Sequence, residues 1–384
     1  MNASPVGRHH HFLALIGLGI LNHTVLTGGR VTVALYALSR GATPLVVGTL
    51  MALYAFMPML LAVSAGRLSD RIGVRKPMLA GSCGIVVGAV IPCVLPGIAP
   101  LYVATSVIGL SFMLFQLSMQ NATGAFGPPV ERAKNFSLLA LGYSISLFCG
   151  PLVAGVLIDH ASFRTAFAVL ALLPLVPIVV LWRGLLQLPG PHAAHAQSTK
   201  GGLIELLGDP RLRRVFIVNG LLSMAWDLHS FFVPIYGAKI GLSASRIGII
   251  LASFATATFA VRLVMPRIAR RFSEFEVLTT ALFVAGAAYA LFPFVEQVGT
   301  LMLLSFVLGL SLGSGQPMVM SLLYSMAPAG RMGEAAGVRM TIVNASTFVM
   351  PLVFGGVGST LGLSPVFWTV GAALGGAGWL ARKR

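Results

Sequence analysis

Twelve long apolar runs constrain the fold of this chain more than any other feature. Each run holds about 18 to 25 mostly uncharged residues, enough for an α-helix to cross a hydrocarbon layer roughly 30 Å thick. A backbone inside lipid must satisfy its own hydrogen bonds, which favours helices over other structures. The runs cover residues 12–36, 45–66, 78–96, 100–124, 136–159, 163–183, 213–236, 245–265, 277–295, 299–322, 336–360 and 364–381. We therefore predict an all-α membrane protein with twelve transmembrane helices.

The placement of charge supports this class. Only 9% of the residues are charged and 57% are hydrophobic, which leaves too little polar surface for a water-soluble globule. A net charge of +16 would suggest nucleic acid binding in a soluble domain. With a cytoplasmic amino terminus, however, the only basic residues on the outer half are Arg30, Arg40, Arg164, Lys239 and Arg246. This positive-inside asymmetry predicts that both termini are cytoplasmic and argues against nucleic acid as a partner.

The sequence also repeats itself after a shift of 200 residues. Tyr36 matches Tyr236, and the triplet 109–111 matches the triplet 309–311. Each half holds six runs, an even number, so both halves enter the membrane from the same side and the repeat is parallel. We predict two pseudo-symmetric six-helix bundles, residues 1–183 and 213–384. A cytoplasmic linker rich in Pro and Gly, residues 184–212, joins them.

A basic turn between the second and third runs carries a family resemblance. Its spacing is similar to the loop motif between helices 2 and 3 of the major facilitator superfamily, and the resemblance extends over nearly the whole chain. The matching residues are Gly66, Leu68, Asp70, Arg71, Gly73 and Arg75. The resemblance implies a transporter that works by alternating access. Asp70 can accept hydrogen bonds from helix-start amides or basic groups, so we expect a cytoplasmic gating latch here. For Arg75 and Lys76 the alternative is that they only obey the positive-inside rule.

A second match lies in the fifth run. Gly142, Gly150, Pro151 and Gly155 resemble the glycine-proline motif of the superfamily's antiporters. The alternative is that these small residues only permit close helix packing. The fourth-helix arginine of the drug-proton antiporters is absent, because its position falls near Thr105. This departure argues against proton coupling in the way those antiporters achieve it.

Polar residues inside the first and seventh runs mark the candidate site, because the resemblance places helices 1, 4, 7 and 10 around a central cavity. The two sets, which share one helix face and are related by the repeat, are His23, Thr27 and Arg30, and Ser223, Asp227 and Ser230. A charge at the centre of a membrane helix costs about 2.5 to 3.5 kcal/mol. We therefore predict that Asp227 couples transport to protons and that it pairs with Arg30. His23 either belongs to this site or packs between helices.

Three amide side chains and one further histidine complete the candidates. Gln116 and Gln120 lie one turn apart in the fourth run, and Gln316 is the repeat mate of Gln116. Amides suit hydroxyl, carboxylate or amide groups of a substrate, although they can also join helices. His229 either relays a proton or packs in the core.

These features favour a secondary transporter. The chain shows neither a phosphate-binding loop nor a catalytic constellation, so we expect no enzyme activity, no cofactor and no metal. Our first prediction is proton-coupled efflux, by antiport, of a small polar or amphipathic organic solute. The alternatives are proton-coupled uptake of a small organic anion or another polar solute, and a non-transporting receptor with the same fold. We expect a small-molecule substrate, protons and the lipid bilayer as partners, and a monomer in a bacterial inner membrane.

Overall fold

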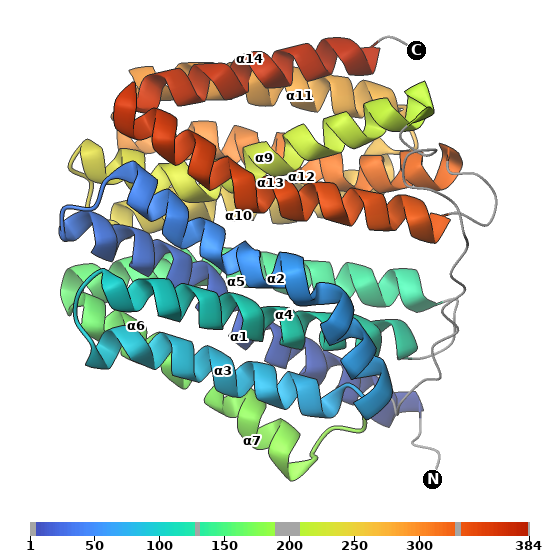
Figure 1. Cartoon of the computed structure of the whole chain (residues 1–384). Helices are drawn as coiled ribbons and strands as arrows, with labels where there is room; N and C mark the ends of the chain where they lie inside the picture. Colours follow the sequence, from blue (N-terminus) through green and yellow to red (C-terminus); the bar gives the residue numbers. More distant parts are fainter. Residues whose placement is uncertain (1–4, 127–130, 189–207, 327–331, 383–384) are drawn as a thin grey trace. The chain divides into compact units, whose positions relative to one another are not determined.

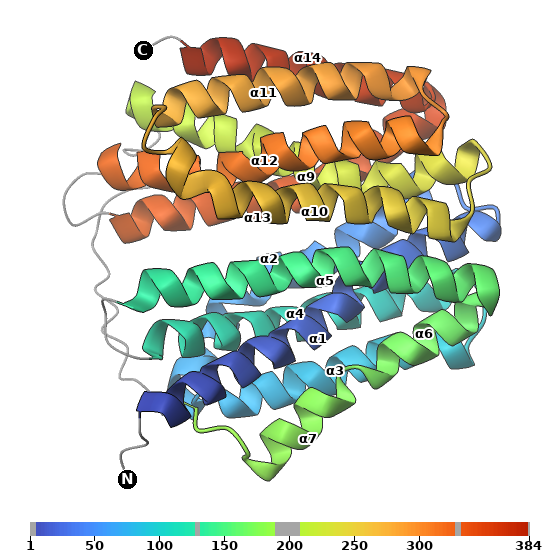
Figure 2. The same ribbon diagram turned by 180° about the vertical axis from the view of Figure 1, so that it is seen from behind.

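The protein is described by a computed structural model for residues 5–126, 131–188, 208–326 and 332–382, and every regular element among them is a helix (Figures 1 and 2). The first half contains α1 (Pro5–Ser39), α2 (Pro44–Ile72), α3 (Arg75–Val94), α4 (Ala99–Ala125), α5 (Arg132–His160), α6 (Phe163–Leu172) and α7 (Leu175–Arg183). The second half contains α9 (Pro210–Lys239), α10 (Ala244–Ile268), α11 (Glu274–Leu291), η2 (Phe292–Phe294), α12 (Val298–Met326), α13 (Met332–Thr360) and α14 (Leu363–Arg382). The predicted all-α fold is confirmed.

The helices cover the predicted apolar runs. Eleven spans among the described residues are long and apolar enough to cross a membrane, and one of them combines α6 and α7. The twelfth predicted run, 364–381, lies within α14, a helix of 20 residues that carries four glycines. Most helices extend a few residues beyond the predicted runs, because an apolar run marks the hydrocarbon layer and not the end of the helix.

Polar caps fix several of these ends. Ser162 accepts a hydrogen bond from the Thr165 amide at the start of α6, and Asp209 does the same for Arg211 at the start of α9. Ser273 and Glu276 form a reciprocal capping box on α11. Such caps satisfy amides that have no partner within the helix, which is why these helices begin where they do.

The chain divides into two compact units. Unit 1 comprises the described residues of Met1–Ala42, Leu53–His195 and Ser243–Gly248, and unit 2 comprises those of Thr43–Ala52, Ala196–Leu242 and Ile249–Arg384. The start of α2 is therefore counted with unit 2, and the start of α10 with unit 1. The predicted boundaries at 183 and 213 stay a prediction, and most of the predicted linker lies outside the described residues.

Equivalent hydrogen bonds hold the start of α2 within unit 2 and the start of α10 within unit 1. In unit 2 the Leu45 amide donates to Ser359 Oγ over 2.9 Å. In unit 1 the amides of Ala244 and Ser245 donate to the carboxylate of Asp159 over 3.0 and 2.7 Å. Positions 45 and 245, and positions 159 and 359, are related by the shift of 200. The repeat thus places an acceptor at each site, as a hydroxyl in one and a carboxylate in the other.

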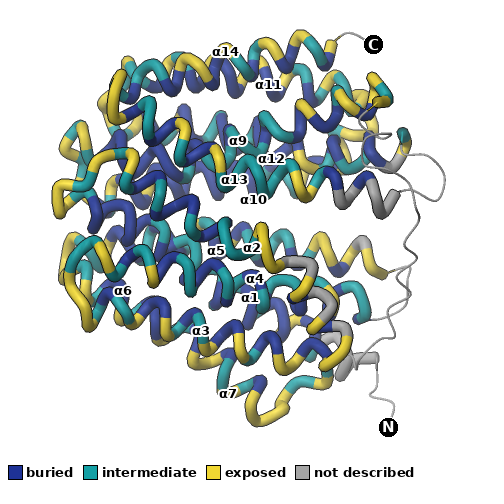
Figure 3. Tube along the Cα trace, viewed as in Figure 1, coloured by how far each residue is buried: buried dark blue, intermediate teal, exposed yellow. Residues whose placement is uncertain are grey.

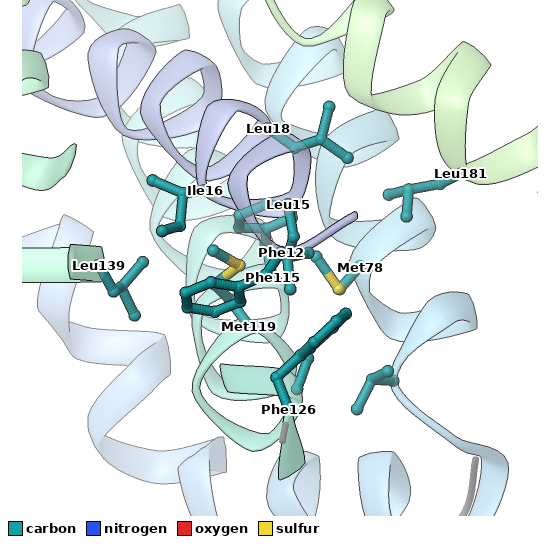
Figure 4. Close-up of a cluster of buried hydrophobic side chains, with 12 residues drawn as sticks. Phe12, Leu15, Ile16, Leu18, Met78, Phe115, Met119, Phe126, Leu139 and Leu181 are labelled. Atoms are coloured by element: carbon teal, nitrogen blue, oxygen red, sulfur yellow. The ribbon is translucent and has the colours of Figure 1, made fainter. Parts of the chain in front are cut away.

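Apolar side chains fill the interior of unit 1 and also cover its outside. Phe12, Leu15, Met78, Phe115 and Met119 are buried together where α1, α3 and α4 meet (Figure 4). Other large apolar residues of the unit are exposed, including Val87 at 56% and Trp182 at 70% (Figure 3). An apolar exterior is expected for helices that face lipid chains.

The repeat is also visible in helix packing. A Cβ atom on Gly109 of α4 would lie 2.8 Å from the backbone carbon of Tyr54 in α2. A Cβ atom on the repeat mate Gly309 of α12 would lie 3.0 Å from the backbone carbon of Phe254 in α10. Both distances are too short for a side chain, so each unit uses a glycine at the same place to bring two helices together.

Candidate substrate and proton-coupling sites

Arg30 is a half-buried cation in unit 1, and no described carboxylate of that unit contacts it. Its guanidinium carbon lies 5.4 Å from the centre of the Tyr54 ring. The Nε atom of Arg30 and the hydroxyl of Tyr54 are both buried, and neither has a hydrogen-bond partner among the described residues. The sequence predicted Arg30 as a site residue. Tyr54 was not among the predicted site residues, and only its position beside Arg30 distinguishes it.

Aromatic rings flank His23, two turns before Arg30 on α1. The imidazole lies 4.6 Å from the Tyr143 ring and 5.5 Å from the Phe112 ring, measured between ring centres. The Tyr143 hydroxyl donates to Oε1 of Gln116. The predicted residues His23 and Gln116 are therefore joined through Tyr143, which was not among the predicted site residues. Gln120 is half-buried one turn further along α4.

Thr27, the third residue of the predicted face of α1, bonds to backbone. Its hydroxyl lies 3.2 Å from the carbonyl of His23 and 3.0 Å from the carbonyl of Ser146 in α5. This links α1 to α5 and leaves the hydroxyl little capacity for a substrate. The role of Thr27 as a substrate ligand stays a prediction.

Asp227 lies half-buried in the middle of α9 in unit 2. Its Oδ2 atom accepts a hydrogen bond from the hydroxyl of Thr347 in α13 over 2.7 Å. Sequence reasoning missed Thr347, although the repeat contained a signal. The α9 and α13 helices are the repeat mates of α1 and α5, and Asp227 is the repeat mate of Thr27, whose hydroxyl donates to a carbonyl of α5. Because Arg30 and Asp227 belong to different units, their pairing stays a prediction.

A second polar contact joins α9 and α13 two turns away. Nε of Arg339 donates to Oδ1 of Asn219 over 3.2 Å. Each of these residues precedes its counterpart in the Asp227 and Thr347 pair by eight positions. Arg339 is half-buried and was not among the predicted site residues.

His229 packs in the core of unit 2. It is 1% exposed and stacks on Phe254 with ring centres 4.2 Å apart. Its Nε2 atom lies 3.0 Å from the hydroxyl of Ser305. These contacts favour the packing interpretation over proton relay. The predicted site residue Gln316 is exposed on α12 and does not take part in the contacts described for Asp227 and His229.

The glycines of the fifth-run motif bring α5 against its neighbours. A Cβ atom on Gly150 would collide with the Thr27 hydroxyl and lie 2.7 Å from the amide nitrogen of Gly28. One on Gly142 would lie 2.7 Å from Cγ2 of Ile16. The third, Gly155, approaches the first turn of α10 in the same way, and Pro151 is buried beside Gly150. The geometry favours close packing, and a role in antiport stays a prediction.

Part of the predicted loop latch lies outside the described side chains. Gly66 and Asp70 belong to α2, but only their backbone is described, so the latch stays a prediction. Gly73 makes the turn to α3 with a φ of 79°, which favours glycine. Arg71 is exposed in the last turn of α2.

Arg75 does more than add positive charge to the loop. Its Nε atom donates to the carbonyl of Leu181, and its Nη2 atom donates to the carbonyl of Trp182 over 2.7 Å. Both carbonyls lie in the last turn of α7, where a cation is favourable, and the Leu181 carbonyl also accepts from the amide of Gly184. Arg75 therefore holds the end of α7 against the start of α3.

Curated relatives and solved structures share this architecture. The tetracycline resistance protein, class G, of Vibrio anguillarum is 25% identical over 338 residues, covering 85% of this chain and 84% of its own. The quinolone resistance protein NorA of Staphylococcus aureus is 22% identical over 377 residues, covering 95% and 92%. A solved peptide transporter POT in complex with sulfate superposes with a TM-score of 0.79 at 15% identity, covering 97% and 93%. At that identity the solved structure shows the fold alone.

The family assignment follows from the sequence profile. The profile of the Major Facilitator Superfamily matches residues 15–295 and 215–383, and the two matches together span nearly all described helices. The two-fold repeat, the helical fold and the apolar spans agree with that assignment. This protein therefore belongs to the Major Facilitator Superfamily of membrane transporters.

Proposed function

We propose that this protein exports a small organic solute in exchange for protons, with Asp227 as the proton carrier. The observation that carries the proposal is the position of Asp227, a half-buried carboxylate in the middle of a membrane-spanning helix. An acid is expensive there and marks a functional site by default. Export is supported by the relatives, whose names are those of tetracycline and quinolone resistance proteins.

Thr347 positions this carboxyl group for proton transfer. A hydroxyl donates to the ionised carboxylate, as in the contact of 2.7 Å, and it can accept from the protonated form. The contact can therefore persist while the proton is gained and lost. The hydrogen bond from Thr347 keeps the Asp227 carboxyl group in place in both protonation states. It does not determine whether the solute is exported or imported.

The test is a proton-release assay in everted membrane vesicles, with tetracycline and a quinolone as probes. Energised vesicles accumulate protons, and an exported solute should release them when it is added. We expect release with the wild type and none with Asp227→Asn. The matched control is Glu296→Gln, which removes an exposed acid outside the helices. Release by Asp227→Asn equal to that of the wild type, at matched expression, would exclude Asp227 as the carrier.

Proton-coupled uptake of an organic anion is the second candidate. The antiporter arginine would fall near Thr105, where this chain has no arginine. Thr105 is buried, and its hydroxyl lies 3.2 Å from the carbonyl oxygen of Tyr102. A neutral residue there is unlike the antiporter pattern. Uptake would appear in the same vesicles as proton movement in the opposite direction when solute is added to the side that corresponds to the cytoplasm.

A further inference from the structure

We propose that unit 1 contains a subsite for the carboxylate of an aromatic organic acid, built around Arg30. This inference rests on the proposed function in one respect: it assumes that the molecule bound at Arg30 is the transported solute. It names a chemical class for that solute, which the fold does not specify.

The first step is the unsatisfied hydrogen-bonding capacity of Arg30. A guanidinium group stays charged in proteins and carries five donors, which suits it to bind a carboxylate with two bonds. Here its Nε atom is buried without an acceptor in the described residues, and the contact given for the group is the Tyr54 ring at 5.4 Å. A ring face offers attraction but accepts no strong hydrogen bond, so the cation is only partly compensated.

The second step is that a further donor lies at the same place. Tyr54 is 3% exposed, and its hydroxyl is buried without a partner in the described structure. A Cβ atom on Gly29 would lie 3.7 Å from that hydroxyl, so the hydroxyl sits over the α1 backbone next to Arg30. Two unused donors, one from α1 and one from α2, therefore lie beside the same short stretch of α1, and a carboxylate bound there can accept from both.

The third step concerns the acids that could compensate Arg30 from within the unit. The acids of unit 1 with described side chains are Glu131 and Asp159, at opposite ends of α5. Asp159 already accepts from two backbone amides. Neither is among the contacts of Arg30. An anionic group supplied by a ligand therefore fits the unit better than an internal ion pair.

The fourth step is the aromatic surface along the same helix face. His23 lies seven residues before Arg30, which corresponds to about 10 Å along the helix axis. Its ring is flanked by Tyr143 and Phe112. Flat rings prefer aromatic partners in stacked or edge contacts. We therefore assign the carboxylate of the solute to Arg30 and its aromatic body to the surface around His23.

The test compares an aromatic acid with its neutral amide on purified full-length protein in nanodiscs. Calorimetric titration with 4-phenylbutyrate and 4-phenylbutyramide isolates the effect of the carboxylate. We expect the wild type to bind the acid at least about tenfold more tightly than the amide, because hydrogen bonds to charged groups are the strong ones. Arg30→Gln should weaken acid binding about 10- to 100-fold and remove the preference over the amide.

The chain offers a matched control in Arg40. It is an exposed arginine in the turn directly after the same helix, and its guanidinium carbon lies 5.2 Å from the centre of the Tyr36 ring. Arg40→Gln should leave both affinities unchanged. If Arg30→Gln does not fold, Tyr54→Phe takes its place, because it keeps the ring and should weaken binding of the acid but not of the amide.

Several results would overturn the inference. These are equal binding of acid and amide by the wild type, no binding of the acid at millimolar concentration, and wild-type affinity for the acid in the variant used. The titration needs no gradient, so it is independent of the proposed function. Acid binding without proton exchange would refute only the export proposal, whereas exchange without preference for the acid would refute only this subsite.

Discussion

The contact between α1 and α5 provides a sharp test of the packing described for unit 1. The substitution is Gly150→Ala. The added methyl group would collide with the Thr27 hydroxyl and lie 2.7 Å from the amide nitrogen of Gly28 and 3.0 Å from the carbonyl oxygen of Thr24. Ordinary van der Waals contacts begin near 3.4 Å, so the two helices must separate by several tenths of an ångström.

Two costs follow from that separation. Overpacking in a well-packed interior costs about 1 to 3 kcal/mol. Displacing Thr27 also weakens its bond to the carbonyl of Ser146 in α5, and a hydrogen bond between membrane helices contributes on average about 0.6 kcal/mol. We therefore expect a loss of roughly 1.5 to 3.5 kcal/mol in the free energy of unfolding. For domains near the size of unit 1, this corresponds to a fall in Tm of roughly 3 to 14 °C.

The assay is thermal unfolding of purified variants in one detergent, followed by fluorescence-detected size exclusion. The control is Gly17→Ala, since nothing lies within 4 Å of a Cβ atom at that position of α1. Its Tm should equal or exceed that of the wild type, because Ala is the better helix former and meets no neighbour there. If Gly150→Ala melts together with the wild type and Gly17→Ala, the close packing of α5 against α1 is wrong.

Three further predictions address contacts that hold other parts of each unit. Arg75→Gln should lower the free energy of unfolding by about 1 kcal/mol in the same thermal assay, because two carbonyls at the end of α7 lose a charged donor. Asp159→Ala should speed amide hydrogen exchange at Ala244 and Ser245 about fivefold, as expected for a lost cap worth about 1 kcal/mol and as mass spectrometry would measure. Thr347→Val should leave Tm nearly unchanged but slow proton-coupled transport roughly threefold, because Asp227 loses the hydrogen bond that the Thr347 hydroxyl donates.

Each of these has a control and a result that would contradict it. Arg71→Gln removes an exposed neighbour of Arg75, so equal losses of stability in the two variants would mean that only loop charge matters. Unchanged exchange at residues 244 and 245 would show that the Asp159 cap is absent in solution. Thr256→Val is the control for Thr347, because the Thr256 hydroxyl bonds only to its own helix, and equal slowing in both variants would remove Thr347 from the proton site.

The apolar runs predicted the helices well because a membrane leaves the backbone few alternatives. They did not predict which side chains meet, because contacts such as Asp227 with Thr347 or Arg75 with Leu181 join residues more than 100 positions apart. Periodicity within one helix contains no information about its partner. The repeat narrows the choice by pairing helices of the two halves, but side chains at matching positions can act differently.

Four positions show how far the repeat can be used. Gly28 and Gly150 bring α1 against α5, whereas their repeat mates are the larger residues Leu228 and Met350, both buried. The close approach of the two helices at Gly28 and Gly150 therefore has no counterpart at Leu228 and Met350 in unit 2. Ser146 and Ser346, by contrast, bond to the carbonyls of residues 20 and 220 in equivalent ways. The fold follows the repeat, while the candidate site depends on where the two halves differ.

The most direct test of the central claim uses purified protein in liposomes with an imposed pH gradient. Wild type should concentrate tetracycline or a quinolone against its gradient, using protons that move in the opposite direction. Asp227→Asn should still exchange labelled for unlabelled solute but should only equilibrate it, because binding remains and proton coupling is lost. Accumulation by Asp227→Asn to the wild-type level would contradict the account, since the proton would then be carried elsewhere.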